Sequence, residues 1–259
     1  MLTTSFLATE SAQARRRSRG ERSNRHSLGR GRDLAVSDAN DILGRVLRSR
    51  VVAIIRGSRL GDVRSILSAL SEGGISAVEV AMNSEGALEA IELAREEFSD
   101  RFVVGAGTVL DPLSARAAIL AGAEFLLSPV LSESVIEICH RYSKLAVPGV
   151  LSPSEVSEAL RLGCRIVKIF PATIFGPQYV RDIKQLFPGV HLMPVGGVSL
   201  DNVSLFMRSG AAAVGVGSQL VNMRWVSSGD FARIVDTAAA FCSRARHDSQ
   251  DSMQVSTSM

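Results

Sequence analysis

The amino-acid sequence predicts an α/β protein with the (β/α)8 architecture of a TIM barrel. Eight short apolar runs alternate with stretches of helical periodicity, and successive runs begin 20–26 residues apart. The runs are apolar almost throughout, as expected for parallel strands that are buried on both faces. One glycine-containing turn recurs between helix and strand, which indicates a repeated unit. The runs are VVAIIR (51–56), AVEVAMN (77–83), FVVGAGTV (102–109), FLLSPV (125–130), LAVPGV (145–150), IVKIFPA (166–172), HLMPVGGV (191–198) and AVGVGSQL (213–220).

Local patterns support the individual helices of this repeat. The turns EGGISAVEV, AGAEFLLS, LGCRIVKI and SGAAAVGV each place a glycine where a helix ends in the left-handed conformation. Ser152 and Glu155 have the spacing of a capping box, which predicts a helix start after the fifth run. A helix at 37–49 precedes the first run, and we expect it to close the N-terminal end of the barrel.

A doubly wound sheet is the competing arrangement of alternating strands and helices. Dinucleotide-binding proteins of that class carry a GxGxxG turn after the first strand. Here the turn after the first run reads RGSRLGD and lacks that pattern. We therefore expect the barrel, with eight strands that are each followed by a helix.

The net charge of +3 is unevenly distributed along the 259 residues. Residues 1–34 hold eight arginines and three acids, so their charge is +5. The other 225 residues carry 29 − 8 = 21 basic and 26 − 3 = 23 acidic side chains, so their charge is −2. This charge gives no indication of nucleic-acid binding by the body of the protein. No apolar stretch approaches the roughly 18 residues of a membrane span, so we expect no membrane partner.

Metal and disulfide sites are not expected either. The three cysteines are scattered without a CxxC pair, and none of the four histidines belongs to an HExxH motif. This pattern fits a reducing compartment and a protein without a metal or other cofactor. Cys139, Cys164, His140 and His191 are interpreted as core or surface residues without a role.

The composition predicts three segments. Residues 1–34 are expected to be a disordered basic tail, 35–246 the barrel, and 247–259 a second disordered tail. The first segment is rich in arginine, serine and threonine and poor in acids, which is typical of a transit peptide. That reading predicts a plastid location, whereas an unprocessed solvated tail, or a localisation signal at Arg15–Arg19, leaves a cytoplasmic location.

Two charged residues lie inside otherwise apolar runs. Barrel enzymes place their active sites at the C-terminal ends of the strands, so these runs are the place to search. Lys168 is flanked by apolar residues in IVKIFPA, and burial lowers the pKa of an amine toward that of an imine-forming nucleophile. Glu79 lies in AVEVAMN, where burial raises the pKa of a carboxyl into the range of a general acid–base. A structural ion pair between the two is the simpler alternative.

Glycine-rich turns follow the seventh and eighth runs. Gly196 and Gly197 in the first turn and Gly217 and Ser218 in the second can present backbone N–H groups and a hydroxyl to a phosphate. Arg56, at the end of the first run, is a candidate partner for a carboxylate or phosphate, or else part of a salt bridge at the rim.

The segments VEVAMNS, VGAGTVL, SPV, VKIFPAT, FGPQY, VGGV and GVGSQL together resemble the KDPG/KHG aldolase family, whose members are class I aldolases. The similarity covers about 51–222 in the same order. It implies that Lys168 is the Schiff-base lysine and Glu79 the general acid–base. It also implies a pyruvyl pocket and a phosphate site, a phosphorylated keto-acid substrate, no metal and a homotrimer. The residues of this implied pocket are Thr108, Pro129 and Phe170, and those of the phosphate site are Gly196, Gly197 and Ser218.

The sequence departs from the gluconate-type enzymes at two positions. It has Asn83 where arginine is common and Val195 where threonine is common. These residues, with MNS, KIFPATIFGPQY and VGGV, are more similar to the 6-phosphogalactonate branch, so both C4 epimers stay open as substrates. Two other classes also stay open: another phosphate-binding barrel enzyme, and a catalytically silent barrel that binds a phosphorylated ligand.

Overall fold

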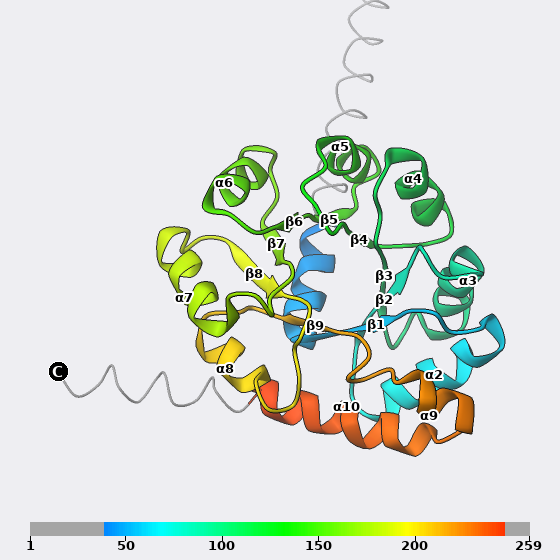
Figure 1. Ribbon diagram of the computed structural model, residues 1–259. Helices are drawn as coiled ribbons and strands as arrows, with labels where there is room; N and C mark the ends of the chain where they lie inside the picture. Colours follow the sequence, from blue (N-terminus) through cyan, green and yellow to red (C-terminus); the bar gives the residue numbers. More distant parts are fainter. Residues whose placement is uncertain (1–38, 247–259) are drawn as a thin grey trace, which may run out of the picture.

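The computed structural model describes residues 39–246, and the predicted tails at 1–34 and 247–259 lie outside these residues. Within them, strands and helices alternate along the chain, and the helices from α2 to α10 lie outside the strands (Figure 1). The strands are β1 (Val51–Ile55), β2 (Ala77–Ala81), β3 (Val103–Gly107), β4 (Phe125–Leu127), β5 (Leu145–Val147), β6 (Gly149–Val150), β7 (Ile166–Ile169), β8 (His191–Pro194) and β9 (Val214–Val216). Each of the eight predicted runs contains a strand, and the fifth contains two.

The strands are parallel and form a curled arrangement. One sheet has the order β5-β4-β3-β2-β1-β9, and the other has the order β6-β7-β8. Two isolated parallel bridges, Leu192 to Ala211 and Val195 to Gly215, join the segment of β8 to that of β9. The α/β class and the parallel strands are therefore as predicted.

The fifth run differs from the prediction of one continuous strand. Pro148 divides it into β5, which pairs with β4, and β6, which pairs with β7. Proline has no N–H to donate to a neighbouring strand, so the ladder cannot continue through it. Its carbonyl still accepts a hydrogen bond from the Lys168 N–H at 2.9 Å.

Helices cover the outer face of the strands. They are α2 (Leu60–Glu72), α3 (Ala87–Phe98), α4 (Pro112–Leu120), α5 (Glu133–Arg141), α6 (Pro153–Arg161), α7 (Gly176–Leu186), α8 (Val203–Arg208), α9 (Met223–Ser228) and α10 (Phe231–Arg246). The four predicted glycine turns are confirmed, because all four contain a glycine with positive φ. In the first, Gly74 has a φ of 87°, and the next N–H bonds back to Leu70 at 3.0 Å. The capping box of Ser152 and Glu155 is also present.

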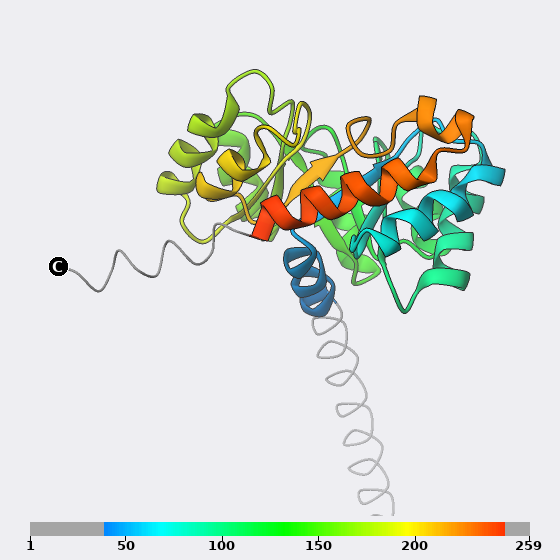
Figure 2. The same cartoon turned by 90° about the horizontal axis from the view of Figure 1, so that it is seen from below.

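The helix predicted at 37–49 is observed over 39–49, the part that the structure describes. Figure 2 shows it projecting from the body beside the end of α10. Its buried Ile42, Leu43 and Val46 join an inner apolar cluster with residues of the strands. Arg45 fixes it to the body through Glu124 at 3.1 Å and the Phe102 carbonyl at 2.9 Å. No helix within 39–246 is both long and apolar enough to span a membrane.

Candidate active site

Lys168 and Glu79 are buried charged residues on different strands. Lys168 lies on β7 and is 3% exposed, whereas Glu79 lies on β2 and is fully buried. The Lys168 Nζ lies 4.6 Å from the centroid of the Phe170 ring, where an ammonium interacts favourably with the aromatic face. No hydrogen bond or ion pair joins the two side chains in the described structure, although each charge partly shifts the pKa of the other.

The Glu79 carboxyl lies over β3 without a hydrogen-bond partner among the described residues. A Cβ added to Gly107 would lie 1.5 Å from Glu79 Oε1, so the carboxyl occupies space that only a glycine leaves free. Burial raises the pKa of Glu79, and the nearby positive charges of Lys168 and Arg56 oppose part of this rise. A buried carboxyl with an elevated pKa is suited to accept and return a proton.

The amine of Lys168 is affected in the opposite direction. Burial lowers the pKa of Lys168, the charge of Glu79 raises it in part, and Arg56 lowers it further. Since burial is the largest cause for both groups, the site favours their neutral forms. A neutral amine is the form that attacks a carbonyl carbon.

Arg56 lies at the end of β1 and is exposed. It donates a hydrogen bond to the Thr108 hydroxyl at 3.0 Å, and it has no ion-pair partner within 39–246. The salt-bridge interpretation of Arg56 is therefore wrong for the described residues. Thr108 has a φ of 56°, a left-handed conformation that is uncommon for threonine and that turns the chain at the end of β3.

A cavity of about 320 Å³ opens at the C-terminal ends of β1, β8 and β9. It brings together seven of the predicted site residues, which are Arg56, Phe170, Val195, Gly196, Gly197, Gly217 and Ser218. Gly196 and Gly197 have φ values of 92° and 73°. A Cβ on Gly197 would lie 1.8 Å from Thr173 Cγ2, so this turn requires glycine on two grounds.

Four predicted residues lie outside the lining of this cavity. They are Lys168, Glu79, Thr108 and Pro129. Phe170 and Arg56 connect Lys168 and Thr108 to the cavity, through the ring contact with Lys168 and the hydrogen bond to Thr108. Pro129 packs instead against Gly149, where an added Cβ would lie 2.4 Å from the Pro129 carbonyl.

The cavity also contains residues that the sequence analysis did not single out, among them Ile54, Gln219 and Met223. Ile54 and Gln219 belong to predicted runs. Their positions near the strand ends are the only feature of the sequence that indicates a place in the cavity. Met223 begins α9, and its sulfur accepts a hydrogen bond from the Ser58 hydroxyl at 3.6 Å. No sequence pattern connects these two distant residues.

The family model for "KDPG and KHG aldolase" matches residues 42–237. The chain belongs to this aldolase family. The 2-dehydro-3-deoxy-6-phosphogalactonate aldolase of Escherichia coli is 32% identical over 171 residues, which are 66% of this chain and 83% of that protein. The 2-dehydro-3-deoxy-phosphogluconate aldolase of Treponema pallidum is 32% identical over 188 residues, which are 72% of this chain and 89% of that protein.

A solved structure of the same aldolase family bears on the chemistry. KDPG aldolase from Legionella pneumophila, with pyruvate captured at low pH as a covalent carbinolamine intermediate, matches with a TM-score of 0.71 and 31% identity. The match covers 74% of this chain and 94% of that protein. The similarity therefore extends over nearly the whole of a family member that forms a covalent adduct with pyruvate.

Proposed function

We propose that this protein is a class I aldolase, a carbon–carbon lyase that cleaves a 2-keto-3-deoxy-6-phospho sugar acid to pyruvate and glyceraldehyde 3-phosphate. The observation that carries the proposal is the buried Lys168 amine, next to a cavity at the strand ends. The phosphogalactonate and phosphogluconate aldolases of the family supply the substrate class. The covalent pyruvate carbinolamine of the Legionella enzyme supplies the type of intermediate.

In the proposed mechanism Lys168 is the nucleophile. Its neutral amine attacks the C2 ketone, and the neutral carbinolamine takes up a proton from solvent and loses water to give a protonated imine. The final hydrolysis returns that proton. The C3–C4 bond then breaks as its electron pair moves into the imine, and the resulting enamine is protonated at C3. Hydrolysis releases pyruvate and restores the amine, so the reaction requires no metal or other cofactor.

We assign Glu79 the proton transfers. The positive charge of the protonated imine on Lys168 favours the carboxylate form of Glu79. As a carboxylate Glu79 removes the C4 hydroxyl proton, directly or through a water, so that glyceraldehyde 3-phosphate leaves as an aldehyde. The same group then returns a proton to C3 of the enamine. The burial that raises its pKa gives the group the affinity for a proton that both steps need.

The remaining site residues bind the two ends of the substrate. Gly196, Gly197, Gly217 and Ser218 form the proposed phosphate site, and a phosphate held there fixes the reacting carbons relative to Lys168. The proposed pyruvyl pocket comprises Arg56, Thr108, Pro129 and Phe170. The hydrogen bond from Arg56 to Thr108 holds the guanidinium at the end of β1, where it can meet the substrate carboxylate.

Val195 is the proposed residue for recognition at C4. It is buried and lines the cavity beside Gly196. Valine cannot form a hydrogen bond with the C4 hydroxyl, so we propose that both epimers are cleaved, with the galactonate form at least equal to the gluconate form.

We also propose that the two sheets close into a (β/α)8 barrel. The bridge between Val195 and Gly215 supports closure on one side, and the continuity of β5 with β6 through Pro148 supports it on the other. In this arrangement residues 35–246 form one domain. The tails at 1–34 and 247–259 lie outside it, and a transit peptide in the first would direct the protein to the plastid.

The proposed assembly is a homotrimer. Large apolar side chains are exposed in the segments after β3, β4 and β7, namely Leu110, Leu113, Val130, Ile174 and Phe175. Apolar side chains of this size are costly to leave in water and mark candidate contact surfaces. Sedimentation should give three times the chain mass of 27.6 kDa.

Borohydride reduction in the presence of pyruvate tests the function. An imine on Lys168 is reduced to a stable secondary amine, which mass spectrometry locates on the peptide containing that lysine. Absence of this adduct would contradict the class I mechanism. A phosphate-binding barrel of another reaction class, or a silent ligand-binding barrel, would give no adduct.

A further inference from the structure

Arg56 is held by the loops that follow the two neighbouring strands. The strands β1, β2 and β3 are adjacent in one sheet, so the loops at their C-terminal ends lie side by side. The Arg56 guanidinium donates to the Thr108 hydroxyl after β3 at 3.0 Å. The peptide that follows Arg56 donates to the loop after β2, because the Gly57 N–H bonds to the Ser84 Oγ at 2.9 Å. The side chain and the backbone of Arg56 therefore each have a partner on a different loop.

The turn at Gly57 does not by itself fix the direction of this peptide. Gly57 has a φ of 70°, and glycine adopts positive and negative φ about equally readily. Apart from its chain neighbours, no atom of the described residues would lie within 4 Å of a Cβ on Gly57, so packing does not hold the turn either. The hydrogen bond to Ser84 is therefore the contact that selects this orientation of the peptide.

A hydrogen bond to this peptide acts directly on Arg56. A peptide group is planar, so a partner for the Gly57 N–H also fixes the Arg56 carbonyl and with it the angle ψ at the Arg56 Cα. The strand β1 holds the chain up to Ile55 on the other side. These two constraints determine the direction in which the Arg56 side chain leaves the backbone, and Thr108 fixes its far end.

Ser84 is well placed to act as an anchor. Its own N–H bonds to the Ala81 carbonyl at 2.9 Å, which closes the turn after β2 and holds the Ser84 backbone. Its hydroxyl is thus presented to Gly57 from a fixed position. Ser84 does not line the cavity of the proposed active site, so an effect of Ser84 on the reaction must pass through Arg56.

We propose that Ser84 is a positioning residue for Arg56, and that its hydroxyl directs the guanidinium toward the substrate carboxylate by holding the peptide after it. The inference rests on the proposed function, in which Arg56 meets that carboxylate.

A second consequence concerns Lys168. Burial lowers the pKa of Lys168, the charge of Glu79 raises it in part, and the charge of Arg56 lowers it further. A guanidinium that is no longer held near the amine lowers the pKa of Lys168 less. Imine formation then requires a higher pH, which a general loss of stability would not cause.

The test compares Ser84→Ala, which removes the acceptor, with Ser84→Thr, which keeps it. The Ser58 hydroxyl still donates to the Met223 sulfur in both variants, so the loop after β1 should stay folded. Arg56→Ala gives the effect of losing the guanidinium itself. Steady-state cleavage gives KM and kcat, and borohydride trapping with pyruvate at a series of pH values gives the pH of half-maximal adduct.

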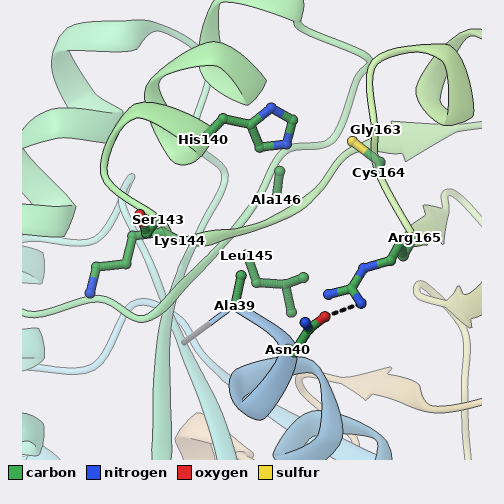
Figure 3. A pocket seen from close by; sticks show the side chains of 10 residues that line it. All are labelled: Ala39, Asn40, His140, Ser143, Lys144, Leu145, Ala146, Gly163, Cys164 and Arg165. Carbon is green, nitrogen blue, oxygen red and sulfur yellow. Dashed lines mark hydrogen bonds between the residues drawn. The ribbon is translucent and has the colours of Figure 1, made fainter. Parts of the chain in front are cut away.

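Two control variants lose a hydrogen bond elsewhere. Ser152→Ala removes a serine hydroxyl that accepts the Glu155 N–H at 3.3 Å at the start of α6. Asn40→Ala removes the oxygen that accepts from Arg165, which directly precedes β7 and so lies at the opposite end of the strands (Figure 3). Both controls should keep the KM and the trapping pH of the wild type, whatever their effect on thermal unfolding.

We expect Ser84→Ala to raise KM about three- to tenfold, the effect of one net hydrogen bond, with kcat within about twofold of wild type at a pH where the amine is neutral. The pH of half-maximal trapping should rise, as it should to a greater extent in Arg56→Ala. Ser84→Thr should restore both values. In an Arg56→Ala background, Ser84→Ala should change neither value further, since the residue through which it acts is gone.

A wild-type KM and trapping pH in Ser84→Ala would overturn the inference. A full loss from Ser84→Ala in the Arg56→Ala background would also overturn it, because the effect would then not pass through Arg56. In both cases the wild type still forms the adduct, so the proposed function stands. A wild type that forms no adduct at any pH overturns the proposed function, and the inference with it.

Discussion

Replacement of Gly107 by alanine tests whether the position of the Glu79 carboxyl matters to the reaction. The added methyl would lie 1.5 Å from Oε1, 2.2 Å from Cδ and 2.6 Å from Cγ of Glu79. Ordinary contacts between such atoms are about 3.5 Å or longer, so the carboxyl must move by about 2 Å. The strand itself has no need to move, because alanine tolerates extended backbone.

The expected loss follows from this displacement. A misplacement of about 1 Å can cost about 100-fold in rate, so Gly107→Ala should lower kcat by at least about 100-fold. Overpacking of a buried site costs about 1–3 kcal/mol, so the variant should remain folded at 25 °C. The imine with pyruvate should still form, because Lys168 is not displaced.

Gly105→Ala is the matched control on the same strand. The three atoms nearest to its methyl, at 2.5–2.7 Å, all belong to the Phe125 ring, so the crowding falls on Phe125 and not on the Glu79 carboxyl. Pyruvate release in a coupled assay and thermal unfolding should be measured for both variants. A kcat for Gly107→Ala within threefold of that for Gly105→Ala would refute the argument. In a Glu79→Gln background the Gly107 substitution should add little, since both changes remove the same interaction.

Further predictions concern the two charged groups and the cavity. Lys168→Met should abolish cleavage and borohydride trapping while the protein stays folded, and turnover within tenfold of wild type would contradict the imine mechanism. Glu79→Gln should still form the imine but lose about 10²–10⁴-fold in kcat, measured by pyruvate release. The same variant removes a negative charge that raises the pKa of Lys168, so the pH at which trapping becomes efficient should fall, and an upward shift would be inconsistent with the structure. Val195→Thr should shift kcat/KM toward the gluconate epimer by about 1–2 kcal/mol, and a wild type that strongly prefers that epimer would refute the role of Val195.

The secondary structure was largely predictable because its determinants are local. Strands buried on both faces give apolar runs, and a helix that ends in a left-handed turn favours glycine at a fixed place. The turn after α5 has Ser143, with a φ of 56°, in place of glycine. Because serine is not typical of a left-handed turn, the sequence does not indicate this one. The proline at position 148 can be read from the sequence. That it divides the run into two strands with different partners depends on which strands lie on each side.

The candidate site was predictable where one residue conflicts with its neighbours in sequence. Lys168 and Glu79 were identified because charge is costly within apolar strands. The glycines of GAGTV gave no indication of what approaches them. The structure shows that Gly105 makes room for Phe125 and Gly107 for Glu79. Such contacts between strands depend on register, as in the pairing of Glu79 with Gly105, and register is not local information.

The burial of Glu79 is unfavourable for folding, because a carboxyl without a hydrogen-bond partner loses its hydration and gains no bond in return. Lys168 is also buried, and burial removes the hydration of its ammonium. The charge of Glu79 and the Phe170 ring offset only part of this lost hydration energy. An apolar pair would fill the same space at lower cost. The proposed reaction accounts for this arrangement, because it needs an amine without its proton and a carboxyl able to take one. The same burial lowers the pKa of the amine and raises the proton affinity of the carboxyl, so the destabilising feature of the fold is the one that prepares the site for catalysis.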